Sequence, residues 1–320
     1  MRRLFVFAHT TTKEVLRQPT FFLILWFGTL MIILSPLFSF FTLLESKRLI
    51  QDAGFSTILI TGLLLGVFSA SGVIYRELKE RTAATILSKP AGRGSFVAGK
   101  FLGIAFSIGV AVYLMSIVLA AIVRHGAKVA VYEESDAPVV VLLAIAIGVS
   151  FGYGFVANYF FRKNFCATTI KASLVLLTAA FAGLCVISPD WRIAGFGEHI
   201  PWHVLVAGLL LLFGILILST WAIAISVRFH LPVALLATSG IFMLGLMSDY
   251  VFGRFASSNF FARVLYSLVP NVQFFWIGDA VGAERAIPAE YVLTAGCYAA
   301  FYIAAILFAA AFLLETREID

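Results

Sequence analysis

The chain has 320 residues, of which 61% are hydrophobic and only 12% are charged. Soluble domains contain about 45–50% apolar and about 25% charged residues, and one soluble core cannot bury so much apolar surface. The composition excludes an ordinary soluble domain, and its apolar content also excludes an intrinsically disordered chain. It indicates an all-α polytopic membrane protein, because the apolar runs are continuous and lack the two-residue alternation of a membrane barrel.

The formal net charge is +6. In a membrane protein such an excess is typical of cytoplasmic loops, so we expect the lipid bilayer and no nucleic acid as a partner. Cys166, Cys185 and Cys297 lie in or beside apolar runs and have no CxxC spacing. They predict neither a disulfide framework nor a metal site.

Residues 1–19 are predicted to form an amphipathic helix in the membrane interface. Apolar side chains recur near one face of that helix, and Pro19 ends the pattern before the first long apolar run. The helix would either anchor the first span or take part in coupling.

Residues 20–320 are predicted to form one transmembrane domain with about eight spans. A hydrocarbon core of about 30 Å needs about 20 helical residues, and eight apolar stretches are near this length. They cover residues 20–44, 55–75, 97–123, 138–161, 170–188, 203–227, 231–252 and 290–314.

Basic residues predict the orientation of these spans. With the N-terminus inside, the inner segments 1–19, 76–100, 162–171, 228–230 and 315–320 contain 15 of the 23 Lys and Arg residues. The outer segments 45–54, 124–137, 189–202 and 253–289 contain the other 8. The positive-inside rule therefore predicts that both termini lie in the cytoplasm. The expected location is the plasma (inner) membrane.

The predicted span interiors carry almost no ionisable side chains. This argues against an ion-coupled transporter or channel, which usually needs buried carboxylates or histidines. The sequence also lacks an intramembrane pair of Asp residues, a Ser/His set and an HExxH motif, which argues against a membrane enzyme. No catalytic, cofactor-binding or metal-binding residue is predicted, so if the chain moves a substrate, the energy is expected to enter from outside the membrane.

Three GxxxG pairs predict close helix packing, either within one subunit or between two copies. These pairs are Gly62 and Gly66, Gly99 and Gly103, and Gly148 and Gly152.

The connection at residues 76–93 is predicted to contain a short cytoplasmic helix. Glu77 and Glu80 lie in its first turn, where the helix dipole favours acidic side chains, and Pro90 prevents its continuation. A helix from Glu77 to Leu87 would be about 16 Å long, too short and polar to cross the membrane. It is suited to present one face to a cytoplasmic partner.

Residues 94–100 fit the GxxxxGK pattern of a phosphate-binding P-loop. However, Phe101 follows Lys100, where a P-loop requires Ser or Thr, and no strand precedes it. We therefore expect no nucleotide site in this chain.

The stretch from Glu77 to Lys100 resembles the coupling loop of type-two ABC transporter permeases, in which an acidic short helix precedes the pattern T…LLS.P.sR..F..GK. The matching residues are Glu77, Glu80, Thr82, Leu87, Ser88, Pro90, Arg93, Phe96, Gly99 and Lys100. The resemblance extends to residues 13–21, 268–280 and 315–320. Many members have six spans, so the eight predicted here would be a six-span core plus an extra pair at 138–161 and 170–188.

This resemblance implies the membrane subunit of an ABC exporter, paired with a second permease copy and with cytoplasmic ATPase subunits that bind ATP and Mg²⁺. It also implies short outer helices within residues 253–289. The residues implied in ATPase coupling are Glu77, Glu80, Thr82, Thr85, Ile86, Leu87, Ser88, Pro90 and Arg93. The alternatives are an ion-coupled transporter or channel, a membrane enzyme, and an ABC complex that transmits force without moving a solute. Neither the substrate nor the choice between homodimer and heterodimer follows from the sequence.

Overall fold

The computed structural model describes residues 2–39, 46–75, 93–129, 136–255, 259–278 and 287–315. These parts are almost entirely helical; they hold no strand, apart from an isolated β-bridge between Ile187 and Ile193. Six of their helices are long and apolar enough to cross a membrane, or up to eight if each of two bent helix pairs forms one span. The predicted all-α, multi-span class is thereby confirmed.

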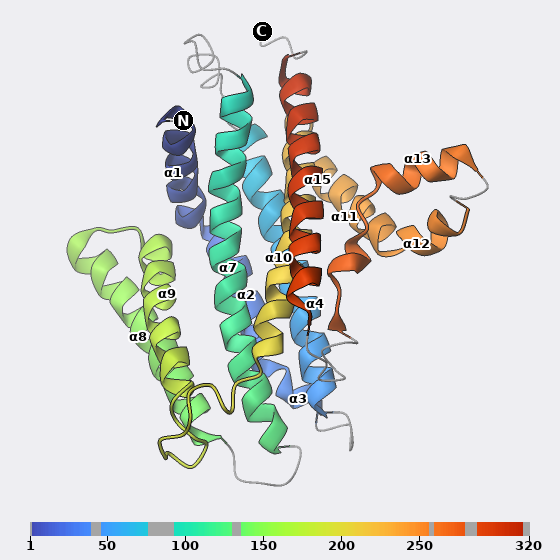
Figure 1. The fold of residues 1–320 in the computed structure, drawn as a ribbon. Coiled ribbons are helices and arrows are strands. Elements are labelled where there is room, and N and C mark those ends of the chain that lie inside the picture. The colour runs from blue at the N-terminus through green and yellow to red at the C-terminus, as the bar shows by residue number, and fades with distance from the viewer. Residues whose placement is uncertain are drawn as a thin grey trace.

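Three long helices form the centre of the bundle: α4 (Ser46–Ala70), α7 (Arg93–Val129) and α10 (Trp202–Ser226). Each packs against the other two; α2 (Pro19–Leu34) covers α4 and α7, and α15 (Ala289–Glu315) covers α10 and α7 (Figure 1). In α7 the most apolar stretch is 78% buried. A helix that is apolar around its whole circumference is stable in such a central position.

Small residues allow the central helices to approach closely. A Cβ atom at Gly62 would collide with Ile215 of α10, and one at Gly66 would collide with Ser219 one turn further along α10. This GxxxG pair therefore packs α4 against α10 within one subunit, the first of the two alternatives given by the sequence.

The first and seventh predicted spans are both interrupted, the first of them by a local feature. The helix of the first span ends at Leu34, because Pro36 has no N–H group and the Ser35 hydroxyl donates to the carbonyl of Ile32. A short helix, α3 (Pro36–Ser39), follows. In the seventh span, α11 (Leu231–Leu246) ends at Met247, and the segment Ser248–Phe255 continues at an angle of 67°.

Helices α8 (Ala137–Phe161) and α9 (Phe165–Leu184) form a hairpin at the edge of the bundle (Figure 1). Their most apolar stretches are only 28% and 33% buried. They match the pair predicted at 138–161 and 170–188, except that α9 begins five residues earlier. The Asn164 side chain causes this difference, since it caps the new helix by accepting from the N–H of Ala167.

After α11 the chain forms α12 (Ser248–Val251), η2 (Gly253–Phe255), α13 (Phe260–Leu268) and η3 (Val272–Phe275). Helices α12 and α13 project sideways from the bundle (Figure 1). One carboxylate oxygen of Asp249 accepts from the Tyr266 hydroxyl at 2.8 Å and from the Asn271 amide at 2.9 Å. These bonds join α12, α13 and the start of η3.

Helix α1 (Arg2–Arg17) packs against the first part of α7. In Figure 1, α1, the beginning of α7 and the end of α15 all lie at one end of the bundle. The loop between α9 and α10 lies at the other end. We call the end that holds α1, the beginning of α7 and the end of α15 the terminal end of the bundle. The side of the membrane on which it lies stays a prediction.

Candidate functional site

Eight of the nine residues predicted to contact an ATPase lie in residues 76–92, outside the described residues. The ninth, Arg93, is the first residue of α7. The structure does describe the two elements on either side of this segment, namely the π-helix η1 (Ser71–Tyr75) before it and α7 after it. The candidate site is therefore built from these elements and from α1, which contacts both.

Helix α1 lies directly on the glycine face at the start of α7. A Cβ atom at Gly99 would lie 2.6 Å from the Cβ of Phe7, and one at Gly103 would lie 2.6 Å from the carbonyl oxygen of Ala8. The Thr12 hydroxyl also donates to the carbonyl of Gly103 at 3.3 Å. This second GxxxG pair thus holds the amphipathic helix against the bundle.

A buried lysine joins the same two helices. Lys100 of α7 is 3% exposed, and its ammonium group lies 3.9 Å from the carboxylate of Glu14. It also lies 5.6 Å from the centre of the Phe96 ring, which Phe7 contacts edge-on at 5.7 Å. A buried ammonium group needs such partners, because desolvation of an unpaired charge is costly. The lysine of the GxxxxGK pattern therefore has a structural environment within the α1–α7 contact.

Residues 94–100 form the first turns of α7. A P-loop instead wraps phosphates in a glycine-rich loop between a strand and a helix. This stretch therefore differs from a P-loop in its backbone form, and the expected absence of a nucleotide site stays a prediction.

The π-helix η1 contacts α1, α10 and α11. A Cβ atom at Gly72 would lie 3.4 Å from the Gln18 side chain, and the rings of Tyr75 and His230 are 6.5 Å apart. A π-turn interrupts the regular helical hydrogen bonding and often occurs at functional positions. Here it ends immediately before residues 76–92 and touches three other helices.

The buried charged side chains of the described parts are Lys100, Arg124 and Asp136. Arg124 and Asp136 form an ion pair where α7 ends and α8 begins, away from α1. Within the described residues, no group of three or more His, Cys, Asp or Glu side chains could hold a metal ion. The described spans thus contain no buried carboxylate that could relay a proton near their centre.

Sequence reasoning missed two of these features. It placed Arg124 and Asp136 in an outer loop, because a spacing of 12 residues around a predicted helix break gives no signal of a contact. It also left the face of α1 that meets α7 unassigned, although Gly99 and Gly103 were visible as a packing motif.

The fold is that of a multi-span α-helical membrane protein. At its terminal end, the contact between α1 and α7 holds α1 against the central bundle. A family model described as "ABC-2 family transporter protein" matches residues 8–196, more than half of the chain. The chain belongs to this family, and the resemblance drawn from the coupling loop is confirmed. No curated protein matches the chain.

Family membership identifies the chain as a membrane subunit of an ABC transporter and implies an ABC ATPase partner. The matched range includes residues 8–17 of α1, the central helices α4 and α7, and the peripheral hairpin of α8 and α9.

Proposed function

We propose that the chain is the permease subunit of an ABC exporter, in which ATP hydrolysis on a separate ATPase subunit drives substrate across the membrane. ATP and Mg²⁺ would bind to the partner chains. Two permease copies would form the pathway, and residues 76–93 would contact the ATPase.

The observation that carries this proposal is the place of residues 76–93 in the chain. They lie inside the range of the family match, and they carry the acidic, amphipathic and proline-terminated pattern of a coupling helix. They also connect η1 directly to α7.

The contacts around this segment support a mechanical route. Helix α7 and α1 share a close glycine-mediated interface and the buried pair of Lys100 and Glu14, so they would move as one body. A push on residues 76–93 would shift α7 together with α1. At the other end of the segment, η1 would carry the same motion to α10 and α11, which it contacts. This is a shear movement between packed helices.

The proposal is tested by replacing Thr82 with Pro in a complex of the full chain and its ATPase. Proline removes a helical hydrogen bond and clashes with the preceding turn, at a cost of about 3 kcal/mol. The matched control is Thr82→Ala, which keeps helical propensity. We expect both variants to insert normally, and Thr82→Pro alone to lose ATPase copurification or substrate-stimulated ATP turnover.

The variant Glu80→Arg separates recognition from folding, because it reverses one charge without breaking a helix. We expect it to weaken ATPase binding. A Thr82→Pro complex with wild-type assembly, turnover and transport would refute the proposed coupling role.

A further inference from the structure

A basic cavity of about 700 Å³ lies between α1, α7 and the hairpin of α8 and α9. Its charged lining residues come from three separate parts of the chain. Lys13 and Arg17 belong to α1, Arg162 and Lys163 to the turn between α8 and α9, and Lys171 to α9. No Asp or Glu is among the described residues that line it. The nearby carboxylate of Glu14 lies at Lys100 instead.

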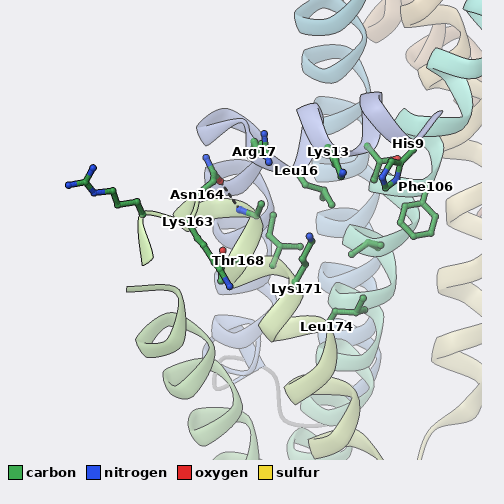
Figure 2. A pocket seen from close by; sticks show the side chains of 15 residues that line it. His9, Lys13, Leu16, Arg17, Phe106, Lys163, Asn164, Thr168, Lys171 and Leu174 are labelled. Carbon is green, nitrogen blue, oxygen red and sulfur yellow. Dashed lines mark hydrogen bonds between the residues drawn. The ribbon is translucent and has the colours of Figure 1, made fainter. Parts of the chain in front are cut away.

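Figure 2 shows how the side chains around this cavity lie, and the Lys163 ammonium group is 5.8 Å from the centre of the Phe161 ring. Lys13 and Lys171 extend from opposite helices into the same space, and all five basic side chains are exposed. Asn164 and Thr168, from the first turn of α9, also line the cavity. The positive end of the α9 helix dipole therefore adds to the potential of the lysines and arginines. The combined field favours an anionic group.

The turn that carries two of these charges has a defined backbone. Arg162 adopts a left-handed conformation with φ of 51°, and the Asn158 amide donates to the carbonyl of Lys163 at 2.7 Å. The side chain of Asn164, the next residue in the turn, accepts from the N–H of Ala167 and so caps α9. The basic side chains thus extend from a turn held by side-chain hydrogen bonds at both of its ends.

His9 and Thr12 of α1 also line the cavity, but the wall formed by α7 and α9 is apolar and belongs to segments long enough to span the membrane. Phe106 and Val110 come from α7, and Ile170 and Leu174 come from α9. Phe106 is 62% exposed. A small soluble anion would satisfy the basic rim but leave the exposed Phe106 ring without an apolar partner. An occupant with both an anionic head and a hydrocarbon body would satisfy both parts.

We propose that this cavity binds the phosphate headgroup of an anionic phospholipid, with its acyl chains against α7 and α9. Basic pockets beside membrane helices attract such headgroups. The bound lipid would fill the gap between α1 and the peripheral hairpin. The proposal does not depend on the direction of transport or on the ATPase.

The first experiment uses the wild-type full chain in nanodiscs of phosphatidylcholine. A trace of photoactivatable phosphatidylglycerol or of matched photoactivatable phosphatidylcholine is added, and crosslinked peptides are identified by mass spectrometry. We expect phosphatidylglycerol to crosslink to peptides of α1 and α9 at least fivefold more than phosphatidylcholine does. Equal crosslinking by the two lipids, or crosslinks spread evenly over the outer helices, would overturn the proposal.

The second experiment removes two charges with Lys13→Gln and Lys171→Gln together. Each basic residue near an anionic surface contributes about 1 kcal/mol, so the double variant should bind phosphatidylglycerol roughly 30-fold more weakly. The control is Arg192→Gln with Arg254→Gln, which removes the same charge away from the cavity and should bind as the wild type does. The double variant Lys13→Arg with Lys171→Arg should keep binding. Loss in the control, or no loss in the glutamine variant, would contradict the site.

A competition experiment identifies the source of the phosphate. Inorganic phosphate and glycerol phosphate at 10-fold molar excess over the labelled lipid should leave the crosslinks unchanged, because neither contacts the apolar walls. If either abolishes the crosslinks, the cavity is a soluble-anion site and the lipid proposal is wrong. The wild-type crosslinking and competition results decide the proposal even if a lysine variant fails to fold.

Discussion

The guanidinium group of Arg124 donates from Nε to the carboxylate of Asp136 at 2.8 Å, and both side chains are almost completely buried. Its other two nitrogens donate to the carbonyls of Leu184 and Ile187 at 2.6 and 2.9 Å. Asp136 in turn caps α8 by accepting from the N–H of Val139. One arginine therefore joins the end of α7, the start of α8 and the end of α9.

Replacement of Arg124 with Met should strongly destabilise this end of the bundle. The change leaves the Asp136 carboxylate buried without its cation, which typically costs about 3–5 kcal/mol. We expect a clear fall in the temperature at which the purified protein loses its monodisperse peak in size-exclusion chromatography. The exposed Arg192→Met variant is the control and should change little. Similar behaviour of the two variants would contradict a stabilising role.

The double variant Arg124→Met with Asp136→Leu should be more stable than Arg124→Met alone. It removes both charges and leaves no buried ion, so much of the desolvation penalty disappears. The same chromatographic assay measures this difference. A double variant less stable than the single one would show that the carbonyl contacts of Arg124 outweigh its ion pair.

The helices with continuous apolar runs could be predicted well from the sequence. The expected span 203–227 corresponds to α10, Trp202–Ser226, and the expected span 138–161 corresponds to α8, Ala137–Phe161. These boundaries follow from hydrophobicity and from local helix caps. The contact between Arg124 and Asp136 could not be predicted, since it depends on where three helix ends meet in space.

The break in the first span had a local signal that hydropathy obscured. Pro36 stands inside the apolar run 20–44, and a window average counts it with its neighbours although it cannot donate a helical hydrogen bond. The bend after α11 lacks such a signal, because no proline lies at Met247. The eight coupling residues at 77–90 lie outside the described residues, so their arrangement stays a prediction.

Replacement of Gly103 with Ala should loosen the contact between α1 and α7. The added methyl group would meet the backbone carbonyl of Ala8 at 2.6 Å, and relief requires a shift of α1. Overpacking of this kind costs about 1–3 kcal/mol. We expect faster hydrogen exchange of α1 amides and a lower thermal transition.

Gly109 provides the matched control for this variant, because it lies in the same helix and an added Cβ would meet nothing within 4 Å. Gly109→Ala should leave α1 exchange unchanged and stabilise α7 by about 0.5–1 kcal/mol through helix propensity. Equal exchange of α1 in both alanine variants would show that Gly103 is not needed for the contact.

Replacement of Tyr266 with Phe should free α13 from α12. The hydrogen bond to the Asp249 carboxylate raises the pKa of the Tyr266 hydroxyl, so the hydroxyl stays protonated and can donate throughout the neutral range. Its loss should cost about 0.5–1.5 kcal/mol at most and increase hydrogen exchange of α13 amides. The exposed Tyr250→Phe variant is the control and should exchange as the wild type does.

The orientation of the bundle can be tested with single cysteines in a variant from which Cys166, Cys185 and Cys297 have been removed. Ser88→Cys reports on residues 76–93, which are predicted to be cytoplasmic from the distribution of Lys and Arg. Ile193→Cys reports on the loop between α9 and α10, where Ile193 is 89% exposed. A membrane-impermeant maleimide should label Ile193→Cys in intact cells and Ser88→Cys only after permeabilisation. Ser257→Cys, placed in the predicted outer segment 253–289, should also be labelled in intact cells. Labelling of Ser88→Cys in intact cells would reverse the orientation and move the proposed ATPase contact to the wrong side of the membrane.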